Sequence, residues 1–551
     1  MEIFQTPSVF FLLAATLAPI ARLIFFFVHD DLWGVSALNR WVGSLELYFG
    51  WVRDFVVIPL ALYCLGMRVY GWIVFQDSFA WPVEILFLGL SLYSRWWRWH
   101  GLRPLQEFAR LNPKVAPEEF WGHLYARLGF LPHRIPLKAK KIIDLAHLDF
   151  RRGKKTKQSF FILLRGVYDT FLFATLICKA YSWKGAHYLK SAGSGLTVVW
   201  ASTIAMRARM EVVVERPPAL ALAVGGKKIF CLGHKSLFDF CLAPLVYFEE
   251  NPDGSAASFI PRVMAAKDHF RDNFFLYRVV GVGKALEALG MIFVDRKSKN
   301  NGTARSAAGL AVKKILSSDM SFAIYPQGTR ALGQWNRDGS RWDAGYFCVG
   351  GRERLKKDGG HFKKGVAYIA VETALSLLKQ KLAGPVWILP VGMLGVGTAC
   401  PKGFLKVQTE VKVVVRMGDP IRIDPASFKK FKTISYRDAS EQEEYKKCVE
   451  EVLQNVDHAL QQLSEVVPRL ERRFFTDLND VLVSREGLDE VAVAFKEWRQ
   501  EGELVYVILD CIYALPKRIA DSFLVELANC FRRDCSREDL IRLRNKIATT
   551  L

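Results

Sequence analysis

Gly233-His234-Lys235-Ser236-Leu237-Phe238-Asp239 follows directly on the apolar run Lys227–Leu232, which has the pattern of a β-strand. The residues after it have a helical pattern, so this stretch is a strand-to-helix turn. His234 and Asp239 are five residues apart, a spacing that can bring imidazole and carboxylate to the same side of the turn. The carboxylate would then fix the ring tautomer and stabilise the imidazolium that forms when the histidine takes a hydroxyl proton.

The start of a helix explains the same residues without any chemistry. Ser236 could be the N-cap of that helix, and Asp239 its capping partner at the third helical position. His234 would then be an ordinary turn residue. Both interpretations stay open for this turn taken alone.

Short apolar runs alternate with helical patterns from about residue 220 onwards, which indicates an α/β domain. In Glu410–Met417, Val411, Val413 and Val415 alternate with Lys412, Val414 and Arg416, which predicts a half-buried strand before the turn Gly418-Asp419-Pro420. The other expected strands are Lys227–Leu232, Phe259–Ala266, Met291–Val294, Phe322–Tyr325 and Val386–Leu394, and the expected helices include Thr303–Leu316 and Gly365–Leu378.

Two of these strands run into polar turns. Met291–Val294 is followed by Asp295-Arg296, which places Arg296 at the carboxyl end of a strand, where ligands sit in open α/β sheets. Tyr325-Pro326-Gln327-Gly328-Thr329-Arg330 follows the other, and its glycine permits close backbone approach while Thr329 and Arg330 offer donors suited to phosphate. Each segment alone could also be an ordinary turn.

These turns, together with Leu389-Pro390-Val391, resemble in their order the blocks of the glycerolipid acyltransferase family. That family shows H-x4-D, G-x-I-F-x-x-R, F-P-E-G-T-R and a V-P-V-type block. The resemblance covers roughly residues 225 to 421 and includes Phe362-Lys363-Lys364-Gly365 and Gly418-Asp419-Pro420-Ile421. The proline inside Val386–Leu394 predicts an edge or a bend in that strand.

The resemblance implies an α/β acyltransferase domain with a mixed, mostly parallel sheet flanked by helices. His234 would be the general base and Asp239 its orienting acid, while Arg296, Gly328, Thr329 and Arg330 would bind the phosphate of the acceptor. The acyl donor would be a thioester of CoA or acyl-carrier protein, attacked directly by the acceptor hydroxyl, with no cofactor and no metal. The favoured acceptor is 1-acylglycerol-3-phosphate; glycerol 3-phosphate and dihydroxyacetone phosphate are alternatives.

The sequence departs from the family pattern in three places. Gln327 stands where the family usually has glutamate, which removes a negative charge beside Arg330 and makes Gln327 a possible modifier of the site. Gly233 replaces a common asparagine. About 30 residues separate Arg330 from Phe362, and this insert, residues 331–361, could be a lid, an interfacial loop or a decorated surface loop.

The composition predicts a protein with both membrane segments and soluble domains. Of the 551 residues, 51% are hydrophobic and 24% are charged, and the formal net charge is +21. A basic protein needs acidic partners, and anionic membrane lipids and phosphorylated substrates fit this composition. Nucleic acid is disfavoured because the positive charge is scattered and no arginine-rich tail is present.

We expect five parts along the chain. Residues 1–99 would hold hydrophobic membrane segments, with candidate spans Val9–Val28, Phe55–Phe75 and Phe79–Leu92. Residues 100–158 read as a basic cytosolic linker and residues 159–210 as a two-helix membrane-anchoring motif. That motif could be two full spans or a shallow hairpin in one leaflet. The acyltransferase domain would cover 211–424 and a C-terminal helical domain 425–551.

The C-terminal region shows helical periodicity and no chemical motif. Apolar residues recur at helical spacing through Glu441–Val467, which predicts one amphipathic helix. The chain has ten cysteines and no C-x-x-C pair, so we expect reduced thiols and an active site that faces the cytosol.

Two other classes of function stay open. The chain could be a non-catalytic lipid-binding membrane protein that keeps an acyltransferase fold, and Gln327 and the long insert favour this alternative. A serine hydrolase is less supported, because no G-x-S-x-G nucleophile motif is present.

Overall fold

The computed structural model covers chiefly the chain from residue 158 onwards, and its contacts fall into two compact units. Among the described residues, the first unit holds Thr170–Leu196 and His269–Leu289, and the second holds residues 158–169, Thr197–Asp268 and Gly290–Leu551. The described residues are 121–122, 125, 158–223, 225–246, 248–250, 256–258, 261–274, 276–277, 281–295, 301–317, 321–336, 340–343, 345–348, 362–402, 407–431, 439–482, 485–500, 503–533 and 535–551.

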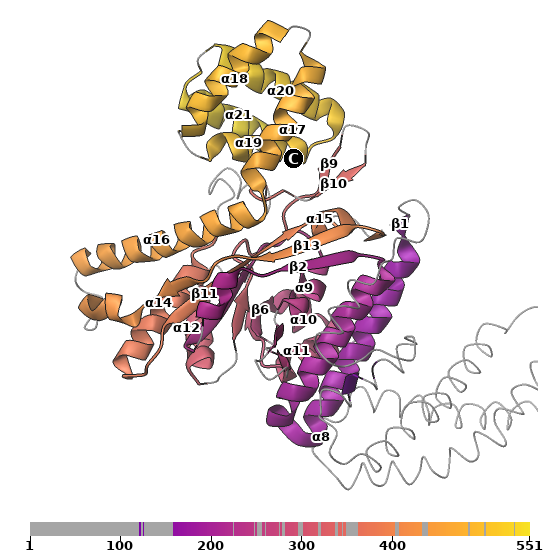
Figure 1. The fold of residues 1–551 in the computed structure, drawn as a ribbon, viewed down its shortest axis with the longest axis vertical. Coiled ribbons are helices and arrows are strands. Elements are labelled where there is room, and N and C mark those ends of the chain that lie inside the picture. The colour runs from indigo at the N-terminus through magenta and orange to yellow at the C-terminus, as the bar shows by residue number, and fades with distance from the viewer. Residues whose placement is uncertain are drawn as a thin grey trace, which may run out of the picture. The chain divides into compact units, whose positions relative to one another are not determined.

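An eight-stranded sheet forms the centre of the second unit (Figure 1). The strand order is β2-β13-β11-β3-β8-β6-β7, and β14 pairs with β11 off this path. β11, β3, β8, β6 and β7 run parallel, whereas β13 and β14 pair with β11 in the antiparallel sense. The bounds are β2 Glu211–Glu215, β3 Lys227–Leu232, β6 Arg262–Ala266, β7 Ile292–Val294, β8 Phe322–Ile324, β11 Val386–Leu394, β13 Lys412–Met417 and β14 Ile421–Ile423. The expected mixed, mostly parallel sheet is confirmed.

The proline of β11 lies in the middle of the sheet, so of the two expectations, an edge or a bend, the edge strand was wrong. On one side, β11 pairs with β3 along Val386–Val391. On the other side its partner changes: β14 pairs as far as Ile388 and β13 begins at Val391. Pro390 therefore sits where neither antiparallel strand needs its missing N–H, and its carbonyl still accepts from the N–H of Gly418 at 2.9 Å. The short strands β2 and β14 were not predicted from the sequence.

Helices pack against the sheet and share one core with it. α12 (Asn301–Leu316) and α16 (Ala439–Leu463) both contact α14 (Gly365–Lys379), and α14 and α16 contact β11. The apolar side of α14 is fully buried, as its helical periodicity predicts, through Val366, Ala367, Ile369, Ala370, Val371 and Ala374. The 3-10 helix η7 (Pro425–Phe431) covers the end of this layer.

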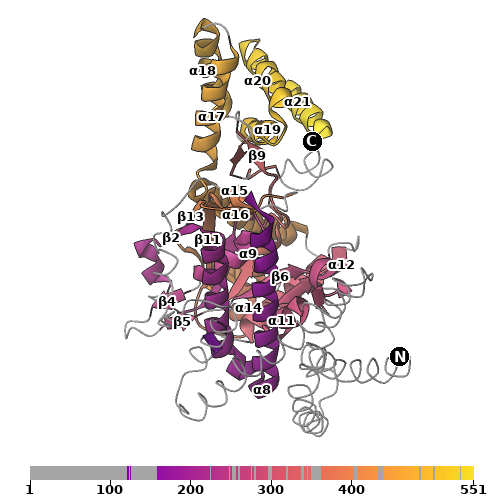
Figure 2. The ribbon, with the colours of Figure 1, turned by 90° about the vertical axis from the view of Figure 1, so that its right-hand side faces the viewer.

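α8 (Phe160–Arg207) folds back on itself (Figure 2). In a straight helix, Asp169 and Arg207 would lie about 57 Å apart at about 1.5 Å per residue. Instead, Nε of Arg207 lies 2.5 Å from the buried carboxylate of Asp169, and Nε of Arg165 lies 3.9 Å from it. Across the part of the chain that is described, no helix combines the length and the apolar content needed to cross a membrane. The candidate spans at Val9–Val28, Phe55–Phe75 and Phe79–Leu92 lie outside the described residues.

In the first unit, α11 (Val282–Ala288) begins after Gly281, whose φ of 77° is in the left-handed region. The hydroxyl of Tyr277 donates to Glu287 at 2.6 Å and ties the preceding segment to this helix.

The C-terminal region is helical as expected, but the helix expected over Glu441–Val467 is broken. α16 ends at Leu463, and α17 (Val466–Val481) starts after Glu465, whose φ of 49° is left-handed. Pro468 explains the break, because its ring would clash with the carbonyl of Ser464 in a continuous helix. α18 (Arg485–Gln500), α19 (Leu504–Tyr513), α20 (Lys517–Arg532) and α21 (Arg537–Thr550) complete the bundle, with Phe474, Phe495 and Phe531 in mutual ring contact.

Candidate active site

The structure brings His234 and Asp239 into contact. His234 follows the end of β3, and Asp239 lies in the first turn of α9 (Phe238–Leu242). Nδ1 of His234 is 2.9 Å from Oδ2 of Asp239. The carboxylate is fully buried, whereas the histidine side chain is 23% exposed. With Nδ1 held by the carboxylate, Nε2 is the ring nitrogen left to exchange a proton with a bound hydroxyl.

The same carboxylate also caps the turn. Oδ2 of Asp239 accepts from the backbone N–H groups of Lys235 at 2.5 Å and Ser236 at 2.7 Å. Oγ of Ser236 accepts from the N–H of Phe238 at 3.2 Å and donates to the carbonyl of Cys400 at 2.9 Å. One oxygen of Asp239 therefore holds the turn and contacts the imidazole. The expectation that Ser236 is the N-cap was wrong, because α9 begins at Phe238 and its N-cap is Leu237.

Gln327 holds the His234 turn, residues 233–239, from the other side. Its Oε1 accepts from the backbone N–H of His234 at 2.5 Å, and its Nε2 donates to the carbonyl of Tyr346 at 2.9 Å. The side chain is fully buried. The ring of Tyr325 packs against the imidazole of His234 with centroids 4.7 Å apart. Gln327 thus connects the His234 turn to the insert.

The turn that contains Gly328, Thr329 and Arg330 lies beside the His234 turn, because the N–H of Ala331 donates to the carbonyl of His234 at 2.9 Å. Gly328 has φ 68°, and Nζ of Lys363 lies 3.1 Å from the place where a Cβ would be. Nη1 of Arg330 is buried with no hydrogen-bond partner among the described residues. Two cations and a close-approach glycine make this turn suited to an anion such as a phosphate. Arg296 lies outside the described residues.

The described residues of the insert, 331–336, 340–343 and 345–348, are mostly buried or half-buried, and Ser340 is exposed. β9 (Gln334–Trp335) and β10 (Arg341–Trp342) form an antiparallel pair. Nε2 of Gln334 donates to Oδ1 of Asp510 in α19 at 2.6 Å, and the other oxygen of Asp510 accepts from the N–H groups of Tyr346 at 2.9 Å and Cys348 at 2.7 Å. Burial raises the pKa of Asp510, and these backbone donors oppose the shift.

Gly345→Ala should destabilise the protein, because the new Cβ would lie 2.5 Å from Oδ1 of the buried Asp510. Overpacking of this kind costs about 1–3 kcal/mol in the free energy of unfolding. Thermal unfolding of the full chain measures it. Gly309→Ala in α12 is the matched control. Apart from its chain neighbours and its own helix backbone, no heavy atom of the described residues lies within 4 Å of its Cβ position, and alanine favours the helix. Equal melting temperatures for the two variants would contradict the expected clash.

Sequence reasoning assigned no role to Lys235, Asp343, Arg469 or Asp510. Asp510 alone had a local signal, because it is an acid inside the apolar helix Leu504–Tyr513. The side chains of Lys235 and Asp343 are at most 4% exposed and lie 2.9 Å apart, across 108 residues of sequence. Within the described residues, no group of three or more histidine, cysteine, aspartate and glutamate side chains has the arrangement of a metal site.

The central segment of the chain is similar to a known protein family. Residues 212–394 match the family model described as Acyltransferase, which confirms the resemblance found in the sequence blocks. Among solved structures, the chain is similar to the 1-acyl-sn-glycerophosphate acyltransferase PlsC from Thermotoga maritima, with 20% identity, 54% of this chain and 98% of that chain covered, and a TM-score of 0.28. No curated protein matches the chain.

Proposed function

We propose that this chain, whose residues 212–394 match the family model described as Acyltransferase, transfers a fatty acyl group from a CoA or acyl-carrier-protein thioester to the hydroxyl of a glycerol-phosphate acceptor. The favoured acceptor is 1-acylglycerol-3-phosphate, and the alternatives are glycerol 3-phosphate and dihydroxyacetone phosphate. The observation that carries the proposal is the contact between His234 and the buried Asp239. It lies beside a turn in which Nη1 of Arg330 has no hydrogen-bond partner within the described part of the chain.

The reaction would proceed in a direct displacement. Nε2 of His234 accepts the proton of the acceptor hydroxyl as its oxygen attacks the thioester carbon. A C–O bond forms, the C–S bond breaks, and the proton passes to the leaving thiolate. Asp239 keeps Nδ1 protonated and stabilises the imidazolium during transfer. Arg330, Thr329 and the backbone at Gly328 would hold the phosphate, and Arg296 would join them.

A membrane setting belongs to the same proposal. The favoured acceptor is a lipid, and a chain with net charge +21 favours anionic membrane surfaces. We propose membrane lipids as partners and a cytosol-facing active site, where acyl-CoA or acyl-carrier protein supplies the donor.

An acceptor panel tests the proposal. The full chain in its membrane is supplied with acyl-CoA or acyl-carrier protein and with each phosphorylated acceptor in turn, and the lipid products are identified by mass spectrometry. Monoacylglycerol, which lacks the phosphate, is the matched acceptor control. We expect product from at least one phosphorylated acceptor and far less from monoacylglycerol. Lipid binding without turnover on any acceptor would overturn the proposal and favour the non-catalytic alternative.

A further inference from the structure

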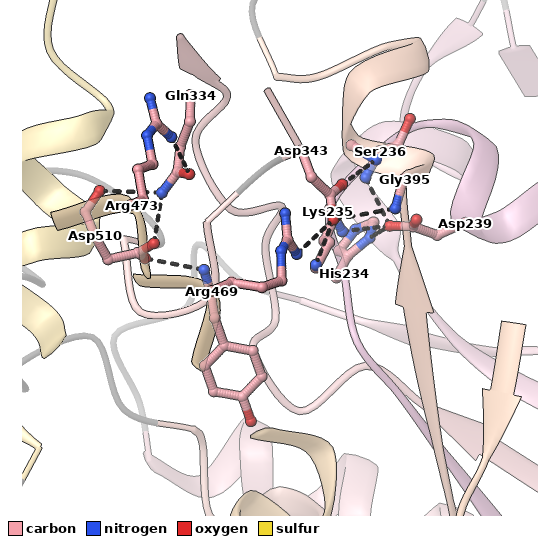
Figure 3. Close-up of polar contacts among 12 residues, drawn as sticks. His234, Lys235, Ser236, Asp239, Gln334, Asp343, Gly395, Arg469, Arg473 and Asp510 are labelled. Carbon is pink, nitrogen blue, oxygen red and sulfur yellow. Dashed lines mark hydrogen bonds and ion pairs between the residues drawn. The ribbon is translucent and has the colours of Figure 1, made fainter. Parts of the chain in front are cut away.

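Asp343 lies at the centre of a buried polar cluster immediately after β10 (Figure 3). Its Oδ2 is 2.9 Å from Nζ of Lys235 and 3.0 Å from Nη1 of Arg469. The carboxylate also accepts from the N–H of Gly395 at 3.1 Å and, through Oδ1, from the N–H of Gly397 at 2.8 Å. Four contacts therefore converge on one side chain from three separate segments.

Lys235 makes this cluster relevant to His234. It is the next residue in the chain, and its own backbone N–H donates to the Asp239 oxygen that contacts the imidazole. Lys235 is thus held at both ends, by Asp239 through its backbone and by Asp343 through its side chain. A shift of Asp343 would be transmitted to the backbone between His234 and Ser236.

Charge makes the cluster hard to rearrange. Lys235 and Asp343 are nearly fully buried, and the side chain of Arg469 is 19% exposed. Burial would raise the pKa of Asp343, but the charges of Lys235 and Arg469 outweigh it and hold that pKa below its usual value. Removing one member leaves a buried charge without its partner, which is strongly unfavourable.

Arg469 brings the C-terminal bundle into the cluster. It lies in the first turn of α17, after the break at Ser464 and Glu465. Its guanidinium also lies 5.4 Å from the ring of Trp342, the last residue of β10, and Asp343 follows directly on this strand. The same ring is 4.7 Å from the guanidinium of Arg473 one turn later. α17 therefore contacts both Asp343 and β10, the strand that precedes it.

We propose that Asp343 and Arg469 are positioning residues, through which the insert and the C-terminal bundle hold Lys235 and so the His234 turn in its reactive geometry. The inference rests on the proposed function for its kinetic consequence. It assigns a role to two parts of the chain that lack any motif of their own: the insert supplies the carboxylate, and α17 supplies the cation that fixes it.

Arg469→Met is the primary test, because it keeps the Lys235–Asp343 pair and replaces a side chain that is partly exposed. A shift of about 1 Å in the position of a catalytic group lowers the rate by about 10²-fold. We expect a smaller shift of the His234 imidazole in Arg469→Met, and therefore a fall in kcat of about tenfold. KM for the acyl donor should not change. Arg469→Lys, which keeps the charge, should recover most of kcat.

Glu465→Gln is the matched control. Glu465 precedes the same helix and pairs with Arg416 of β13 at 3.1 Å, and none of its hydrogen bonds or ion pairs among the described residues involves the His234 turn. It should leave kcat unchanged. If Arg469→Met and Glu465→Gln lower kcat equally, the cluster is only a structural joint and the proposal is wrong.

Hydrogen exchange gives a second measurement that does not depend on turnover. Peptides that contain the His234 turn should exchange at least about tenfold faster in Arg469→Met than in Glu465→Gln, because local opening becomes easier. Unchanged exchange with unchanged kcat would overturn the positioning role. A wild-type chain that forms no product on any acceptor would instead defeat the proposed function, and the exchange rates would still decide the positioning role.

Discussion

His234→Ala should lower acyl transfer by at least about 10²-fold, since a positioned general base contributes about 10²–10⁴-fold. The loss should fall on kcat. Among the hydrogen-bond partners of Asp239 in the described residues, the imidazole of His234 is the side chain that can accept the hydroxyl proton, and the others are backbone N–H groups. The melting temperature should change little, because the histidine side chain is 23% exposed. His458→Ala on α16, where the ring contacts Gln462, is the matched control and should keep full activity.

Two substitutions at Asp239 separate its chemical role from its capping role. Asp239→Asn can keep an oxygen toward the N–H groups of Lys235 and Ser236, so the turn should stay folded while the charge that stabilises the imidazolium is lost. Asp239→Ala also leaves both buried N–H groups without an acceptor, each at a cost of about 1–3 kcal/mol. We expect both variants to lose activity and only the alanine variant to lose much stability. Wild-type turnover in His234→Ala and Asp239→Asn would eliminate the general-base mechanism.

Local spacing explains what could be predicted from the sequence. His234 and Asp239 lie across one short turn after a strand, and the turn with Gly328 and Arg330 follows another. Consecutive strands and helices are bounded by glycines and polar residues, so the positions of β3, β8 and β11 along the chain were predicted from periodicity. Their order in the sheet was not predicted. The family resemblance predicts that these turns form one site.

Long-range contacts explain what could not be predicted. Lys235 and Asp343 are 108 residues apart, and Arg469 is 126 residues from Asp343. Asp510 contacts the insert across 162 to 176 residues. Periodicity does not predict such pairs, because Lys235, Asp343 and Arg469 each look like an ordinary surface charge in the sequence, and the acid inside the apolar helix at Asp510 does not indicate its partner. Two errors had local causes that were visible: Pro468 breaks the expected Glu441–Val467 helix, and the change of partner beside Pro390 allows a proline in a central strand.

Gln327→Glu, which restores the residue usual in the family, should impair this protein and not improve it. The buried amide of Gln327 accepts from the N–H of His234 and donates to the carbonyl of Tyr346. A carboxylate can satisfy only the donor. Its second oxygen would face the carbonyl of Tyr346 without a proton between them, and an unsatisfied buried group of this kind costs about 1–3 kcal/mol, with more for a charge. We expect acyl transfer to fall by about 10²-fold as the His234 backbone shifts.

The pH dependence of stability in Gln327→Glu tests whether the charge of the new carboxylate causes the loss. A neutral glutamate can donate its O–H to the carbonyl of Tyr346 and accept from the N–H of His234, so the stability lost in Gln327→Glu should be smallest in acid. The unfolded glutamate ionises near about pH 4.3, and the deficit should grow as the pH rises above that value until the buried carboxyl ionises as well. Gln327→Met, which loses both hydrogen bonds without adding a charge, should show a deficit that does not vary with pH. Thermal unfolding and kcat measured across pH for wild type, Gln327→Glu and Gln327→Met give the comparison.

A gain of activity in Gln327→Glu would contradict the prediction and show that the amide disables the site. The contact with Tyr346 would then be dispensable, and the reaction would require the negative charge beside Arg330.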